Sequence, residues 1–297
     1  MNKDKTDKIP EELFKKVRKI ELHTKKLVNA MSSGSYTSVF RGQGMEFEEV
    51  REYSAGDDYR KIDWNVTARH NTPYVKRHRE ERELNVMLLL DVSGSLNFGS
   101  SFQTKRNVLV ETAALLAFTS LFNQDKIGSI FFTDRIEQYC YPSKSKNAIL
   151  RMIRDILFFS PEGKSTNINL ALDYAISNMK HRGVIFVFSD FLSDIDSSKL
   201  FIASRKHDII PIIIEDDFEL PGKNIGLVDM IDNETGRKIL VDTGSKAYKD
   251  FLDERQQRKE AFLSELTKYH IEPIRINTTE SAEKPILTYF HKRKRRH

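Results

Sequence analysis

The chain has 297 residues, of which 39% are hydrophobic and 31% charged, which is enough for one large domain or two small ones with a sizeable core. Its net charge of +5 is modest, and its apolar runs are strand-length, far short of the roughly 18 residues of a membrane span. The single cysteine, Cys140, excludes an internal disulfide and a cysteine-based zinc site, so a reducing cytosol is the expected compartment.

Residues 10–31 are predicted to form a helix, because their apolar side chains recur at helical spacing and Pro10 suits a first turn. The N-terminus thus leads into an amphipathic helix rather than a signal-peptide core. The apolar stripe either packs on its own domain or docks on another protein. Residues 32–35, Ser-Ser-Gly-Ser, break the pattern, so 1–35 is expected to be an N-terminal helical segment.

Residues 36–83 are highly charged and strongly punctuated but show no clean period. Strand and helix patterns alternate beyond them, which predicts an α/β domain with an open, mostly parallel sheet flanked by helices, a Rossmann-like class. The predicted strands are 84–91, 126–133, 135–141 (at an edge), 184–190 and 209–214, and the predicted helices are 102–122, 144–158, 168–180 and 197–206.

The C-terminal part is predicted to add a hairpin at 225–242, a charged helix at 245–269, a strand near 271–277 and a short helix starting at 285–290. We therefore expect segment 36–83 to pack on a main domain of 84–297. Residues 291–297 are a basic tail. It is either a solvated end or a contact for anionic lipid or nucleic acid.

Oxygen-bearing side chains follow two of the predicted buried strands. Asp91, Ser93 and Ser95 come at alternate positions after the first strand, and Asp190 ends the strand of 184–190. In open α/β sheets, ligands bind outside the carboxyl ends of strands, where the strand order reverses. If both strands are neighbours there, the carboxylates face one crevice, to which Thr166 of the loop 161–167 could add a hydroxyl.

Oxygen ligands of this kind suit Mg²⁺, or Mn²⁺ and Ca²⁺. Two carboxylates balance a divalent charge and three hydroxyls add none, so the cation stays electrophilic and can accept a carboxylate from a partner protein. The structural alternative is that Ser and Asp at a strand-to-helix turn are capping residues.

The same residues resemble the metal-ion-dependent adhesion site (MIDAS) of the von Willebrand factor A fold. In that family an Asp-x-Ser-x-Ser sequence, a Thr and an Asp hold a divalent cation directly or through water. The resemblance implies a metal site made of Asp91, Ser93, Ser95, Thr166 and Asp190. Lys164 and Ser165 depart from the small glycines that relatives often have there: Lys164 would weaken binding if it pointed inward, and Ser165 could compete with Thr166.

A second resemblance covers about residues 40 to 250 and concerns the domain of unknown function 58 family, which is bacterial. It is carried by Gly42-Gln43-Gly44-Met45-Glu46-Phe47, Arg51-Glu52-Tyr53, Gly56-Asp57-Asp58-Tyr59-Arg60-Lys61-Ile62-Asp63-Trp64 and Ala68-Arg69. Members are often encoded beside MoxR-type AAA+ ATPases. The resemblance implies a metal-dependent protein-binding module that serves such an ATPase as an adaptor or co-chaperone in protein maturation or complex assembly.

The segment containing Asp57, Asp58, Arg60, Asp63 and Trp64 has its own alternatives. It is a salt-bridged clasp that ties the N-terminal part to the main domain, with Trp64 as an anchor, or it is a partner-binding surface. A catalytic acidic cluster is the third and least favoured alternative. Buried charges in such a clasp would need partners, so it would be specific without necessarily being very stabilising.

No catalytic constellation is expected. His-Glu-x-x-His, Gly-x-x-x-x-Gly-Lys-Ser/Thr and Gly-x-Ser-x-Gly are all missing. The alternative to a binding module is a Mg²⁺-dependent phosphoesterase or nuclease that uses the same crevice, although a base beside the ion is not evident. Nucleic acid is not an expected partner. The expected location is the cytoplasm, with at most a peripheral contact of the basic tail with the inner membrane face.

Overall fold

The structure is a computed structural model that describes residues 44–54, 56–70, 72–81, 84–99, 103–219, 226–231 and 238–295. Contacts divide the chain into two units, with Arg41–Leu84 separate from the part that begins at Asn85. The predicted helix of residues 10–31 lies outside the described residues. The expected packing of segment 36–83 on the main domain stays a prediction.

A six-stranded sheet forms the centre of the larger unit, in the spatial order β10-β7-β6-β3-β4-β5. Its strands are parallel except for β5, which pairs antiparallel with β4 at one edge. Their bounds are β3 (Asn85–Asp91), β4 (Lys126–Phe132), β5 (Ile136–Ser143), β6 (Val184–Ser189), β7 (Asp208–Glu215) and β10 (Ile274–Asn277). Numbered along the chain, this is the doubly wound order 3-2-1-4-5-6. The predicted fold class is confirmed.

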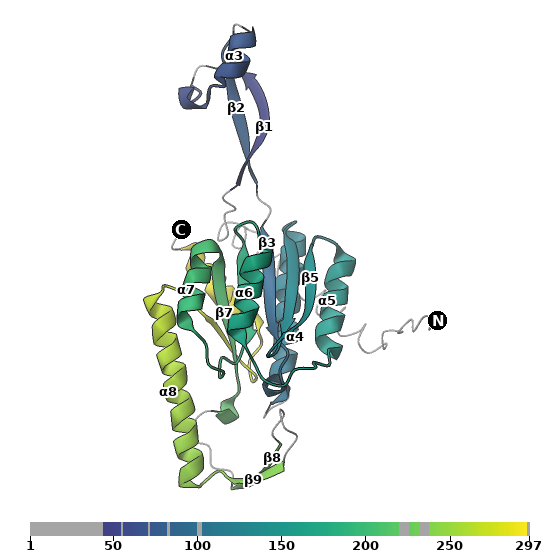
Figure 1. Ribbon diagram of the computed structural model, residues 1–297, viewed down its shortest axis with the longest axis vertical. Helices are drawn as coiled ribbons and strands as arrows, with labels where there is room; N and C mark the ends of the chain where they lie inside the picture. The colour runs from purple at the N-terminus through teal and green to yellow at the C-terminus, as the bar shows by residue number, and fades with distance from the viewer. Residues whose placement is uncertain are drawn as a thin grey trace, which may run out of the picture. The chain divides into compact units, whose positions relative to one another are not determined.

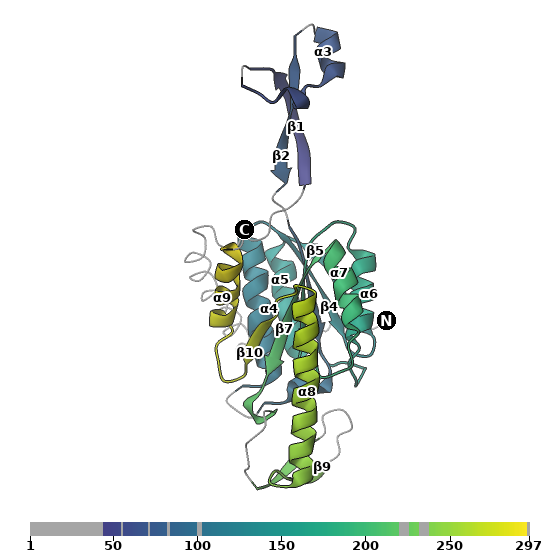
Figure 2. The same cartoon turned by 90° about the vertical axis from the view of Figure 1, so that its left-hand side faces the viewer.

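Helices cover both faces of the sheet, which explains why its central strands are continuously apolar (Figures 1 and 2). All of Val86 to Leu90 in β3 and Ile185 to Phe188 in β6 are fully buried. The helices α6, α7 and α8 pack on one face, around a shared core with β3, β4, β6 and β7, and α4, α5 and α9 lie on the other. They are α4 (Lys105–Phe122), α5 (Lys146–Phe158), α6 (Ile168–Asn178), α7 (Ser197–Lys206), α8 (Lys246–Lys268) and α9 (Glu283–Lys294).

The strand order reverses between β3 and β6, which are parallel neighbours with Leu90 opposite Phe188. The connections that follow the two strands run in opposite directions along the sheet, and ligands of open α/β sheets bind outside the carboxyl ends of such strands. Asp91 is the last residue of β3 and Asp190 directly follows β6. The condition on which the predicted site depends, that these two strands are neighbours at the switch point, is therefore met.

The C-terminal part contains the predicted hairpin, helix, strand and last helix, in the predicted order. The hairpin pairs β8 (Leu227–Ile231) with β9 (Lys238–Asp242). Helix α9 is longer than predicted, because it continues into the basic tail, where Lys292 pairs with Glu272 and Arg293 pairs with Asp208. None of the described helices combines the length and apolar character that crossing a bilayer requires.

The unit Arg41–Leu84 contains an antiparallel pair, β1 (Gly44–Glu52) and β2 (Tyr74–Glu81), with η1 (Tyr59–Lys61) and α3 (Trp64–His70) between them. Three acidic residues of this unit form hydrogen bonds or ion pairs with groups close to them in the sequence. Asp57 pairs with Arg51 at 2.7 Å, Asp58 accepts from the Arg60 amide, and Asp63 accepts from the amides of residues 65 and 66 at the start of α3. Within this unit, Trp64 remains 70% exposed.

Candidate metal centre

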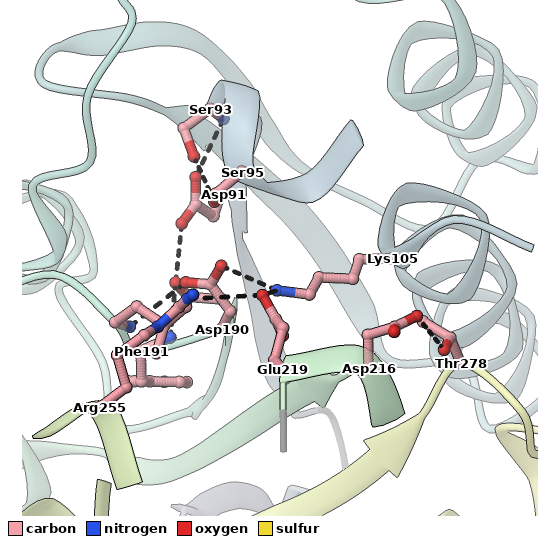
Figure 3. A network of polar contacts seen from close by, with 12 residues as sticks. Asp91, Ser93, Ser95, Lys105, Asp190, Phe191, Asp216, Glu219, Arg255 and Thr278 are labelled. Carbon is pink, nitrogen blue, oxygen red and sulfur yellow. Dashed lines mark hydrogen bonds and ion pairs between the residues drawn. The ribbon is translucent and has the colours of Figure 1, made fainter. Parts of the chain in front are cut away.

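Asp91 ends β3 beside the carboxyl end of β6, and its side chain is buried. Its Oδ1 accepts a hydrogen bond from the Ser93 amide at 3.0 Å, and its Oδ2 accepts one from Ser189 Oγ at 2.7 Å (Figure 3). Each carboxylate oxygen can accept more than one bond. Asp91 is thus oriented by two donors and retains acceptor capacity for a cation.

Ser93 and Ser95 lie beside Asp91 where the chain turns from β3 into η2 (Gly94–Asn97). Their Oγ atoms are 3.2 Å apart. Neighbouring oxygens around an octahedral Mg²⁺ are about 2.9 Å apart, because each Mg–O bond is about 2.0–2.1 Å. Ser93 precedes η2 but its hydroxyl caps no amide there. The spacing fits a pair of cation ligands, and for Ser93 the simple capping alternative does not apply.

Thr166 lies in the loop before α6, and the backbone brings this loop to the same end of the sheet. The Asn167 amide donates to the Thr133 carbonyl at 2.9 Å, and the Val92 amide donates to the Phe132 carbonyl at 3.0 Å. Two successive carbonyls at the end of β4 therefore bind the residues that directly follow Asp91 and Thr166. The side chain of Thr166 is half-buried, whereas Lys164 and Ser165 are exposed. The role of Thr166 as a ligand stays a prediction.

Asp190 is close enough to Asp91 for its charge to act on it, but its carboxylate is bound elsewhere. Oδ2 lies 3.2 Å from Lys105 Nζ, and Oδ1 accepts from the Leu192 amide at 3.3 Å. Lys105 also lies 2.6 Å from Glu219 Oε1. The structure thus brings Asp91, Ser93 and Ser95 into one group, with Asp190 beside it and turned to a buried lysine.

Two charge effects follow from burial at this centre. Burial, together with the charge of Asp190, raises the pKa of Asp91 from 3.8 to about 6. Burial alone would lower the pKa of Lys105, but the charges of Asp190 and Glu219 outweigh it, so the pKa of Lys105 is raised and the ammonium stays protonated. Among the described contacts an ionised Asp91 has only neutral hydrogen-bond donors, so a divalent cation would supply the positive charge that balances it.

The donor chemistry fits a hard cation better than a softer metal. Among the residues for which side chains are described, no three His, Cys, Asp or Glu gather as metal ligands would. The set here differs in kind, since it combines carboxylate and hydroxyl oxygens. Such all-oxygen sets suit Mg²⁺, Mn²⁺ or Ca²⁺.

Sequence patterns did not reveal Ser189, Lys105 and Glu219 as members of this centre. A signal for Lys105 exists in the helical period, since it precedes the buried Val108 and Leu109 by three and four residues and so lies on the same face of α4. For Ser189 the signal is its place beside Asp190 at the end of a buried strand.

A family model described as "Protein of unknown function DUF58" matches residues 49–261. This chain belongs to the DUF58 family. Its membership confirms the resemblance drawn from the sequence around Trp64 and Asp91. Curated relatives include uncharacterized proteins of Mycobacterium bovis and Mycobacterium tuberculosis, each 30% identical over 233 residues, which are 76% of this chain and 73% of the relative.

Solved structures similar to this DUF58 protein include the conserved hypothetical protein BatB from Bacteroides thetaiotaomicron, at 16% identity and a TM-score of 0.49, covering 71% of this chain and 99% of that one. An aerotolerance-related membrane protein from Bacteroides fragilis is 18% identical with a TM-score of 0.47, and the shares are 70% and 99%. The VWA domain of SpRpn10 is 12% identical with a TM-score of 0.41, and the shares are 69% and 95%.

Proposed function

We propose that this DUF58 protein is a metal-dependent protein-binding module. The observation that carries the proposal is the buried Asp91 carboxylate at the switch point of the sheet, with the Ser93 and Ser95 hydroxyls 3.2 Å apart beside it. Ligands of open α/β sheets bind at this edge. A carboxylate and two hydroxyls leave room for an oxygen from a second molecule.

Each residue has a distinct part in this proposal. Asp91 supplies the direct negative charge, and Ser93 and Ser95 supply neutral oxygens. Thr166 would add a third hydroxyl from the loop before α6, and Asp190 would act from the next strand, directly or through water. A bound Mg²⁺, Mn²⁺ or Ca²⁺ would supply an electrophilic centre that a client carboxylate can complete.

Family resemblance suggests the partners. We propose a MoxR-type AAA+ ATPase and a client protein that donates a carboxylate, with the DUF58 protein as an adaptor in protein maturation or complex assembly. The cytoplasm, or the inner face of the membrane through the basic tail, is the place where such an ATPase would meet it.

Binding is favoured over hydrolysis by the groups that surround Asp91. Its hydrogen-bond partners are the Ser189 hydroxyl and the Ser93 amide, and the nearby Lys105 amine is held between two carboxylates. A metal-dependent phosphoesterase needs a base that activates water next to the ion. None of these groups is free to serve as that base.

Calorimetric titration with Mg²⁺ and Mn²⁺ tests the metal site. Wild type should take up one divalent cation, and Asp91→Asn should abolish uptake, whereas Asp194→Asn, an exposed carboxylate after β6, should not. Thr166→Val should weaken uptake and Ser165→Ala should leave it unchanged. If Asp91→Asn still takes up the cation, the proposed metal site is wrong.

Association with a co-expressed MoxR-type ATPase, measured by co-elution in Mg²⁺ and in EDTA, tests the adaptor role. Complex formation should need Mg²⁺ and be lost with Asp91→Asn. A complex that EDTA leaves intact contradicts the metal-dependent role. Turnover across a panel of phosphoesters that depends on Asp91 would instead support the enzymatic alternative.

A further inference from the structure

Lys105 is the first residue of α4, and its side chain is completely buried. Its Nζ lies 3.2 Å from Asp190 Oδ2 and 2.6 Å from Glu219 Oε1, and 6.0 Å from the centre of the Phe98 ring. Glu219 Oε1 also lies 3.5 Å from Arg255 Nη2 on α8 (Figure 3). A chain of four charges therefore runs from the candidate metal centre to α8.

A buried ammonium loses its hydration, and only opposite charges at short distance can offset that loss. Asp190 and Glu219 supply two negative charges to the single positive charge of Lys105. Arg255 shares part of the Glu219 charge but keeps 27% of its side chain exposed. Among the residues that the structure describes, Lys105 is thus the cation that pairs with Asp190.

The position of Lys105 also affects where the Asp190 carboxylate can point. The ammonium engages Oδ2 while the Leu192 amide engages Oδ1. Each oxygen of Asp190 thus has a donor, and the donor at Oδ2 carries a full positive charge, whereas Asp91 is bound by the neutral Ser93 amide and Ser189 hydroxyl. Asp91 is left as the one carboxylate that the centre presents without a cationic partner of its own among the contacts described.

We propose that Lys105 is a built-in counter-cation of the metal centre, which holds Asp190 back from direct ligation and so sets the affinity and electrophilicity of the bound divalent cation. This inference rests on the proposed metal-dependent function. With Asp190 shared, the cation receives one full carboxylate charge instead of two. It binds more weakly but attracts an acidic client more strongly.

After Lys105, Glu219 is a second positioning residue, because its carboxylate competes with Asp190 for the Lys105 ammonium. It follows β7 in η3 (Asp217–Glu219), and it lines a small open pocket together with Asp190 and Arg255. Lys105 itself is shielded from solvent, so Glu219 and Arg255 are the members of the network that a solution change or a partner can reach.

The test compares Mg²⁺ affinity in variants that change the network in opposite directions. Lys105→Gln frees Asp190 and should raise the affinity by about tenfold or more, since two buried carboxylates then face the cation without an opposing ammonium. Glu219→Gln leaves Lys105 to Asp190 alone and should lower the affinity by several-fold. A residue that only supports the fold would lower affinity in both variants.

Glu215→Gln is the matched control. Glu215 lines the same pocket but pairs with Lys259 and Arg275, so its loss should leave Mg²⁺ affinity within about twofold. Should Lys105→Gln fail to fold, Glu219→Gln still decides the matter, because its side chain is 20% exposed and its loss creates no unpaired buried cation.

The outcomes separate the two proposals. If wild type binds Mg²⁺ through Asp91 and Glu219→Gln binds as tightly as wild type, the role of Lys105 is wrong while the metal centre stands. If wild type binds no cation but Lys105→Gln does, the lysine ammonium has replaced the metal, and the proposed function fails instead. If neither binds, both are overturned.

Discussion

Ser189 Oγ donates a 2.7 Å hydrogen bond to Oδ2 of Asp91, across the boundary between β6 and β3. Both residues end buried strands, and the bond joins the two halves of the doubly wound sheet at the point where the strand order reverses. The carboxylate at the switch point is therefore oriented by a neighbouring strand as well as by its own loop.

Replacing Ser189 with Ala should weaken the metal centre. The hydrogen bond from Ser189 lowers the pKa of Asp91 and fixes its orientation, so its loss favours the protonated, misoriented carboxyl group. We expect a several-fold lower Mg²⁺ affinity in calorimetry, and a loss of about 1–2 kcal/mol in the free energy of unfolding. Ser177→Ala, an exposed serine on α6 that bonds only to its own helix, is the control and should change neither quantity. An unchanged affinity in Ser189→Ala would show that the strand-to-strand bond does not orient the carboxylate.

The buried Asp91 predicts how stability depends on pH in metal-free protein. Its pKa is about 6 in the folded state, against 3.8 as the ordinary value, so the folded state binds the proton more tightly. The stabilisation is complete below pH 3.8 and is lost as pH rises through 6, which amounts to about 3 kcal/mol.

Urea unfolding in EDTA at pH 5 and pH 7 measures this effect. Asp91→Asn lacks the titrating group, so the free energy of unfolding of this variant, relative to wild type, should increase from pH 5 to pH 7. In a separate titration without EDTA at pH 7, Mg²⁺ should stabilise only wild type. A difference between the two proteins that is independent of pH would mean that Asp91 titrates normally.

The fold was predictable from sequence where burial dominates the pattern. The runs that became β3 and β6 are apolar from Val86 to Leu90 and from Val184 to Phe188. Asp91 and Asp190 follow them closely, so both the strands and their ligand edge could be identified. The pair β1–β2 could not. A register shift between Phe47 and Glu49 moves Val50 out of the alternation begun by Met45 and Phe47, and a bulge of this kind hides the two-residue period.

The candidate site was predictable only in part, for a related reason. Asp91, Ser93 and Ser95 are adjacent in sequence, so their spacing indicates a ligand set. Lys105 reaches Asp190 only through the packing of α4 on the sheet, where this helix contacts β3, β4 and β7. A lysine in a helix pattern is normally assigned to the solvent face. Its burial depends on two carboxylates, Asp190 and Glu219, that no local pattern connects to it.

In the unit Arg41–Leu84, Asp63 and Trp64 should have separable effects. Asp63 Oδ1 accepts from the amides of residues 65 and 66, so Asp63→Ala should destabilise α3 by about 1 kcal/mol. Hydrogen exchange of the α3 amides would show the loss of protection, with β3 and β6 unaffected. Trp64→Ala removes an exposed side chain and should change stability by no more than about 0.5 kcal/mol. If Trp64 contacts a partner, this variant lowers association without lowering protection, whereas a loss of protection equal to that of Asp63→Ala would indicate a structural anchor.

Gly163 positions the loop that carries Thr166. A Cβ at this residue would lie 2.0 Å from Thr133 Oγ1 and 2.1 Å from Asp134 Oδ1. Thr133 is fully buried and donates to Glu137 Oε1 at 2.7 Å, and the same oxygen accepts from the Gly163 amide at 2.8 Å. The neighbours cannot yield without breaking these bonds, so the loop has to move instead.

We therefore expect Gly163→Ala to cost about 1–3 kcal/mol in stability and to lower Mg²⁺ affinity as much as Thr166→Val does, because both changes withdraw the same hydroxyl. The double variant should be no weaker than either single one in calorimetry. Lys164→Ala, an exposed change in the same loop, should bind Mg²⁺ like wild type. Full affinity in Gly163→Ala, despite the displaced loop, would remove Thr166 from the ligand set and leave Asp91, Ser93 and Ser95 as its core.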